Sequence, residues 1–175
     1  MTDKSNKIND STKLLKDWYV RIRIAQRGHY QDASQLKRKN HFLGIPVVIL
    51  ATVVGAGVFT SIETNPSLYT QITTGLLSLL AAILASLQTF LNYSEKSEKH
   101  LNAARRLTGL KKEIEEILTV YKDNEEKIVE SVSYIRNTWE EITNTAPLIS
   151  DKHFEKFFRE MSGRWWRRLL SCSAM

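Results

Sequence analysis

Two long stretches without a charged residue constrain the fold of this 175-residue chain more than any other feature. The first covers residues 40–62, a run of 23, and the second covers residues 64–94, a run of 31. A run of roughly 20 apolar residues in a helix crosses the hydrocarbon core of a bilayer. The rest of so short a chain is too small to bury two such helices. The runs therefore predict an all-α membrane protein built on a two-helix transmembrane hairpin.

The two spans divide the chain into an ordered series of predicted segments. We expect a disordered leader over 1–10, an N-terminal helix over 13–40, a first span over 42–62, an external loop over 63–71 and a second span over 72–93. Cytoplasmic helices are expected over 94–145, and an amphipathic basic and aromatic helix in the tail over 147–175. The polar first ten residues do not have the form of a signal peptide.

The distribution of charge predicts how the hairpin is oriented. Residues 1–41 carry ten Lys or Arg and four Asp, a net charge of +6, whereas the loop 63–71 contains no Lys or Arg. Cytoplasmic flanks of transmembrane helices are enriched in Lys and Arg. We therefore expect both termini in the cytoplasm. Because the basic residues flank the membrane spans, no direct nucleic-acid binding is expected.

Small and polar side chains recur along one side of each span. These packing or pore candidates are Gly44, Ala51, Gly55, Gly75, Ser78, Ala82, Ser86 and Gln88. Small residues let helices approach closely in lipid. Two interpretations stay open: the stripes join the helices of one hairpin, or part of them lines a pore in an oligomer. The amide of Gln88 needs a partner in hydrocarbon, either a neighbouring helix or water in a pore.

Apolar residues after the second span recur every seven positions. This seam consists of Leu107, Ile114, Tyr121, Ile128, Ile135 and Ile142. A seven-residue repeat of this length predicts a coiled-coil-like helix or helical hairpin, with a bend near residues 123–125. The N-terminal helix carries an apolar face at alternating spacings of three and four, from Leu15 to His29. We interpret the two patterns as one intramolecular bundle, with part of the seam left for contacts in a homo-oligomer.

Two basic clusters are candidates for contact with lipid or a ligand. They are Arg105, Arg106, Lys111 and Lys112 after the second span, and Trp165, Trp166, Arg167 and Arg168 in the tail. Trp and Arg together suit the membrane interface, and packing on the bundle or on a partner is the alternative for the tail. The first cluster is interpreted as a membrane anchor, with a nucleotide ligand as the alternative.

The sequence contains no set of residues that suggests catalysis. Its seven glycines form no phosphate-binding loop, and the four histidines (residues 29, 41, 100 and 153) show no metal-ligand spacing. The single Cys172 excludes an internal disulfide. We therefore expect no enzyme activity, no catalytic residue, no cofactor and no metal.

Several segments in a fixed order resemble the SLATT family, two-span membrane effectors of bacterial conflict systems. They are Trp18–Gln26 with His29 and Tyr30, Leu43–Pro46 and Val54–Phe59, Leu79–Leu91, and Glu95 with Glu98–His100 and Ala103–Arg105. The resemblance extends from about residue 14 to 145 and excludes the tail.

The resemblance implies a defence role at the bacterial inner membrane. Such effectors sit beside nucleotide-signal synthases, nucleotide-sensing proteins or reverse transcriptases, and they are proposed to oligomerise and form pores when infection is sensed. The residues alone leave two other functions open. One is a passive membrane anchor or scaffold that recruits a partner, and the other is a small housekeeping channel subunit.

Overall fold

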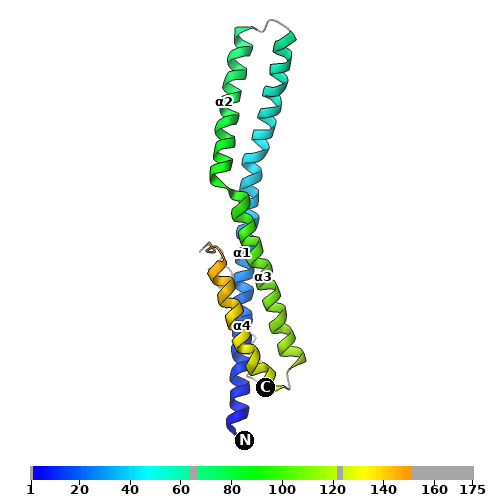
Figure 1. The fold of residues 1–175 in the computed structure, drawn as a ribbon, viewed down its shortest axis with the longest axis vertical. Coiled ribbons are helices and arrows are strands. Elements are labelled where there is room, and N and C mark those ends of the chain that lie inside the picture. The colour runs from blue at the N-terminus through cyan, green and yellow to red at the C-terminus, as the bar shows by residue number, and fades with distance from the viewer. Residues whose placement is uncertain (1, 64–66, 122–123, 151–175) are drawn as a thin grey trace, which may run out of the picture. The chain divides into compact units, whose positions relative to one another are not determined.

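The computed structural model describes residues 2–63, 67–121 and 124–150. It contains the helices α1 (Thr2–Glu63), α2 (Leu68–Leu91), α3 (Tyr93–Val120) and α4 (Glu125–Thr145) (Figure 1). No strand occurs in these ranges, so the all-α prediction is confirmed. Residues 34–97 form one compact unit, here the hairpin unit. The described residues up to 33 and from 98 onward form the other, here the bundle unit.

The hairpin unit consists of the later part of α1 and the antiparallel α2 (Figure 1). Both helices are long and apolar enough to cross a membrane, and the most apolar stretch of α1 contains no buried residue. Large apolar side chains of both helices are open, with Phe42 79% and Phe90 85% exposed. Apolar surface exposed on this scale marks a contact with lipid or with another protein. The two-helix transmembrane hairpin predicted from the sequence is the fold of this unit.

The ends of α2 are defined by two polar residues. The Ser67 hydroxyl accepts a hydrogen bond from the Thr70 amide at 3.4 Å and caps the start of the helix. Asn92 ends it in the left-handed conformation, with φ 43° and ψ 45°. Asparagine adopts this conformation more readily than most side chains. Since α2 begins at Leu68, it starts four residues before the predicted second span.

The helix α1 is longer than the sequence suggested. The predicted helix 13–40 and the predicted first span 42–62 form one element, with Pro46 inside it. The leader 1–10, predicted to be disordered, is helical from Thr2. Extending an existing helix adds one hydrogen bond for each residue fixed, whereas starting a new helix is costly. The polar composition of residues 1–10 therefore did not prevent helix formation.

A three-helix core lies in the bundle unit. The fully or almost fully buried residues are Leu15 and Ile22 of α1, Leu107, Leu110, Ile114 and Ile117 of α3, and Ile128, Ile135 and Ile142 of α4. Trp18 and Trp139 pack against this core with their rings edge to face, 6.0 Å between centroids. The seven-residue seam is thus buried within a single chain. Tyr121 differs from the other seam residues, because it lies beyond the end of α3 and is only half-buried.

The bend predicted near residues 123–125 separates α3 from α4. Asn124 caps α4 by accepting a hydrogen bond from the Lys127 amide at 3.2 Å. The Lys127 side chain also reaches back to the end of α3, where its ammonium lies over the Tyr121 ring, 4.3 Å from the ring centroid. The predicted tail 147–175 is described only as far as Ser150. The predictions for Trp165, Trp166, Arg167, Arg168 and Cys172 lie outside the described residues.

The core position of Ile128 predicts a large effect of a charge there. Replacing the 2%-exposed Ile128 with Asp removes a packed side chain and buries a carboxylate without a partner. We expect the free energy of unfolding of the bundle to fall by about 3–5 kcal/mol. Thermal loss of helicity in detergent, followed by circular dichroism, measures the change.

The neighbouring residue provides a matched control for this substitution. Val129 is 36% exposed, so Val129→Asp introduces the same charge one position away at a cost within about 0.5 kcal/mol. Equal thermal stability of the two variants would show that the buried face of α4 has been assigned incorrectly.

Candidate functional site

The two helices of the hairpin meet along rows of half-buried residues at spacings of three and four. On α1 the row is Leu43, Val47, Leu50, Val54 and Gly57, and on α2 it is Thr74, Leu77, Ala81, Leu84, Gln88 and Leu91. Spacings of three and four keep a row on one side of a helix. Most of these residues are branched and aliphatic, so the hairpin is joined mainly by side-chain packing.

Close approach of the two helices occurs at two glycines. A Cβ atom added at Gly44 would lie 3.2 Å from the amide nitrogen of Gln88. A Cβ atom added at Gly57 would lie 3.5 Å from the Thr74 hydroxyl. The predicted candidates Gly44 and Gln88 are therefore brought together, and the Gln88 amide lies against the neighbouring helix of its own chain.

The other small-residue candidates lie mainly outside the hairpin contact. Ala51, Gly75, Ala82 and Ser86 are exposed, and Ser78 is half-buried. A Cβ atom added at Gly55 or Gly75 would meet nothing within 4 Å. Half of the eight candidates, Gly44, Gly55, Ser78 and Gln88, are half-buried, and the interpretation that the stripes join the two helices stays a prediction. Larger side chains of the two rows, such as Leu50 and Leu84, supply more of the buried apolar surface.

Two hydroxyl groups in the second half of α2 are satisfied without a partner helix. Ser86 donates to the Ala82 carbonyl at 2.8 Å, and Thr89 donates to the Ala85 carbonyl at 3.0 Å. Such bonds to the preceding turn remove the penalty of placing a hydroxyl in hydrocarbon. The stripe of Ala51, Gly55, Gly75, Ala82 and Ser86, here the outward stripe, is therefore compatible with lipid, with water or with another helix.

The predicted basic cluster on α3 is divided by the bundle. The Arg106 guanidinium forms an ion pair with Glu141 of α4 at 2.6 Å and donates to the Thr145 hydroxyl at 3.1 Å. Arg105 and Lys112 are exposed, and Lys111 is half-buried. Because Arg106 has a structural role between α3 and α4, the four residues do not act as one cationic site.

Two histidines that are 71 residues apart in sequence form a buried pair in the bundle unit. The Nδ1 atoms of His29 and His100 are 3.1 Å apart, within hydrogen-bonding distance, and the ring centroids are 5.2 Å apart. The side chains are 4% and 7% exposed. A hydrogen bond between two Nδ1 atoms requires one ring to donate and the other to accept. At least one ring must therefore be neutral in the folded protein.

The surroundings of the pair disfavour its protonation. Burial, and next the neighbouring His100, lower the pKa of His29 to about 4, against the opposing charge of Asp32. Burial also lowers the pKa of His100, again opposed by Asp32. The Asp32 carboxylate is itself buried and accepts a hydrogen bond from the Ser150 amide at 2.9 Å. The pair and Asp32 thus link α1, α3 and the segment that follows α4.

The pairing of these histidines was not predicted, although the sequence contained a signal for it. His29 ends the apolar face that begins at Leu15, and His100 lies seven residues before Leu107, in register with the seam. Histidines on two faces that pack together can meet at any separation in sequence. The expectation of no metal site rested on local spacing alone. In the described ranges, no group of three or more His, Cys, Asp or Glu side chains could hold a metal ion.

Comparison with known families gave one match. A model described as "SMODS and SLOG-associating 2TM effector domain family 4" matches residues 12–157. The match includes both candidate spans, the histidine pair and the whole three-helix core. Searches of the curated proteins and of the solved structures gave no match.

The histidine pair predicts that acid destabilises the bundle. The unfolded chain takes up a proton at the ordinary His pKa of 6.5, whereas folded His29 does so only near pH 4. The unfolded state therefore binds more protons between these values. The contribution of the pair to stability should be fully present above pH 6.5 and should be lost as the pH drops toward 4. Thermal unfolding of the bundle at several pH values measures this.

Substitutions separate the pair from other titrating groups. The double variant His29→Gln with His100→Gln should have a flatter stability profile between pH 6.5 and 4. The variant His41→Gln, at an exposed position outside the bundle unit, should keep the profile of the unmodified chain. A double variant with an unchanged profile would contradict the assignment.

Proposed function

The chain belongs to the SMODS and SLOG-associating 2TM effector family, and from this premise we propose that several copies of its hairpin assemble and open a conducting path in the bacterial inner membrane. The family is one of membrane effectors with two transmembrane helices, and the two exposed apolar helices of this chain agree with that description. Opening such a path would depolarise the cell and stop its growth. In this proposal the chain defends the bacterium against infection by a phage.

The observation that carries the proposal is the outward stripe. One hairpin has only two helices, which cannot enclose water, so a path requires several copies. Gly55 and Gly75 have open space around them, and Ser86 is exposed. Small residues at such positions support close contacts between helices of different copies. Because the Ser86 hydroxyl of the stripe can exchange the Ala82 carbonyl for water, the same surface is suited to line a path.

The closed core of the bundle directs assembly toward the hairpin. Ile114, Ile128 and Ile135 are at most 2% exposed within one chain, so the seam has little surface left for a second copy. The homo-oligomer expected from the sequence would then form through the transmembrane helices. The uncharged stripe predicts weak selectivity among ions.

The proposed trigger is a partner protein that acts on the bundle. The family description names association with SMODS and SLOG proteins. A nucleotide-signal synthase, a nucleotide-sensing protein or a reverse transcriptase fits this position. Both α1 and α3 contain residues of each unit, so a change in the bundle has two covalent routes to the hairpin. No catalytic step is part of the proposed function.

The proposed orientation predicts two cytoplasmic termini. Lys37, Arg38 and Lys39 precede the apolar part of α1, and Lys96 and Lys99 follow α2, whereas residues 63–71 contain no Lys or Arg. Reporters that are active only in the cytoplasm should work when fused to either end of the chain. Activity of an external reporter at the C-terminus would refute the orientation.

The outward stripe predicts how bulky substitutions affect depolarisation. Overproduction should lower the membrane potential, because a higher concentration favours assembly. Gly55→Leu should suppress this, since the larger side chain prevents close approach between copies, and a Cβ atom at this position meets nothing within 4 Å in its own chain. A potential-sensitive dye measures the effect, and membrane fractionation verifies that the variant inserts.

A neighbouring residue controls for added bulk. Ala56→Leu introduces a large side chain at an exposed position on another side of α1 and should depolarise like the unmodified chain. If inserted protein leaves the potential intact even when its trigger or partner is present, pore formation is refuted. The anchor function would then be favoured, since the bundle is closed by itself and offers its surface to a partner.

A further inference from the structure

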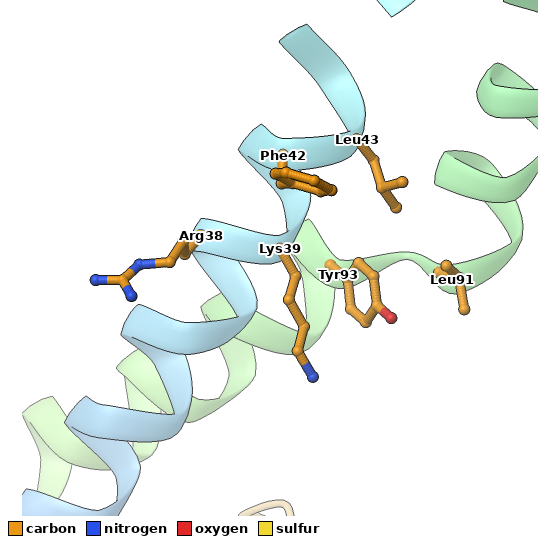
Figure 2. Close-up of a pocket in the computed structure, with 6 residues that line it drawn as sticks. All are labelled: Arg38, Lys39, Phe42, Leu43, Leu91 and Tyr93. Carbon is orange, nitrogen blue, oxygen red and sulfur yellow. The ribbon is translucent and has the colours of Figure 1, made fainter. Parts of the chain in front are cut away.

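A cavity in the hairpin unit lies where α2 gives way to α3. Its volume is about 430 Å³, and it is lined by Arg38, Lys39, Phe42 and Leu43 of α1 and by Leu91 and Tyr93 from the other side (Figure 2). We propose that this cavity binds one anionic phospholipid, with the phosphate at Lys39 and an acyl chain along the apolar side chains. The inference goes beyond the proposed function and requires only that the hairpin is inserted in a membrane.

The cavity exists because the helix is interrupted at Asn92. The left-handed conformation of this residue ends α2 at Leu91, and α3 begins with Tyr93. In the described part of the chain, Asn92 is the one non-glycine residue with a positive φ. The last side chain of α2 and the first of α3 therefore separate, and both border the same gap (Figure 2). The Asn92 side chain donates to the Glu95 carboxylate, which holds the junction from the α3 side.

The chemistry of the lining changes from charged to apolar over one turn of α1. Lys39 is the last charged residue before the uncharged run, and Phe42 and Leu43 follow one turn later. This places the ammonium at the depth of lipid headgroups and the other two residues at the depth of the first acyl carbons. Phe42 is 79% exposed, so it offers a large apolar surface with no cover from its own chain.

The position of Lys39 suits a phosphate. Its ammonium lies 5.7 Å from the centroid of the Tyr93 ring, an arrangement that attracts the cation to the ring face and holds it at the cavity. An ammonium group has three donors, and the ring face satisfies none of them fully. Figure 2 shows that the Arg38 side chain extends away from Lys39 and Tyr93, so we assign the contact with the phosphate to Lys39 alone.

The sign of the charge selects the class of lipid. Two of the six lining residues are cations and none is an acid. A phosphate without a compensating positive group, as in phosphatidylglycerol, matches this charge. Phosphatidylcholine carries its own ammonium, which would be placed next to Lys39 and Arg38. The cavity therefore favours an anionic over a zwitterionic lipid with the same acyl chains.

The test uses the full chain in mild detergent. Phosphatidylglycerol and phosphatidylcholine with identical acyl chains are titrated in parallel, and bound lipid is counted by native mass spectrometry. We expect one phosphatidylglycerol to remain bound and phosphatidylcholine to be lost. Lys39→Gln should weaken phosphatidylglycerol binding roughly tenfold, because it removes one charged hydrogen bond to the phosphate. Phe42→Gln, at an exposed position, should weaken it through the acyl chain.

A matched control is available two residues away. Lys37 is exposed, precedes the same helix segment and does not line the cavity, so Lys37→Gln removes an equal charge and should leave binding unchanged. Circular dichroism verifies that all variants keep their helices. If Lys37→Gln and Lys39→Gln weaken phosphatidylglycerol binding equally, the lipid is attracted by the general positive charge and not by the cavity. That result would overturn the proposal. Retention of phosphatidylcholine, or displacement of the lipid by inorganic phosphate alone, would also overturn it.

Discussion

The uncharged length of two helices is the constraint on which the rest of the structure depends. Backbone groups in hydrocarbon must be paired within the same segment, which leaves the helix as the form for each run. The hairpin contains no room for ionisable groups, so the charged residues lie in the flanking segments. Those segments must then fold without the help of the apolar runs. The three-helix core around Ile114, Ile128 and Ile135 meets that requirement, because it is complete within the bundle unit.

The parts of the fold that depend on contrast between polar and apolar residues could be predicted from the sequence. In the bundle, solvent-facing positions are charged, so the seven-residue repeat identified the buried face and the bend near Asn124. In the hairpin the positions that face lipid and those that face the other helix are both apolar, so polarity does not distinguish them. The sequence therefore does not distinguish the small residues from Leu50 and Leu84, which are half-buried in the rows where the helices meet. The histidine pair was missed for another reason, since local spacing cannot reveal which helix faces meet.

Stability and membrane activity rest on different sets of residues in this chain. The bundle is held by an aliphatic core, an ion pair between Arg106 and Glu141, and a histidine pair that favours neutral rings. The hairpin is held by aliphatic rows with two close approaches at glycine. The outward stripe contributes little to the packing of the bundle or of the hairpin. A surface that the monomer does not need for folding can change by substitution without loss of the fold.

The left-handed residue at Asn92 also sets the phase of the helix that follows. If α2 continued without a break, its row through Gln88 and Leu91 would reach Glu95, Glu98 and Asn102, all of which are exposed and polar. The buried row of α3 instead runs through His100, Ala104 and Leu107. One residue outside the helical region rotates the two patterns relative to each other, as an insertion does in a coiled coil. The heptad register of α3 is thereby separate from the register of α2, whereas α1 carries one register through both units without a break.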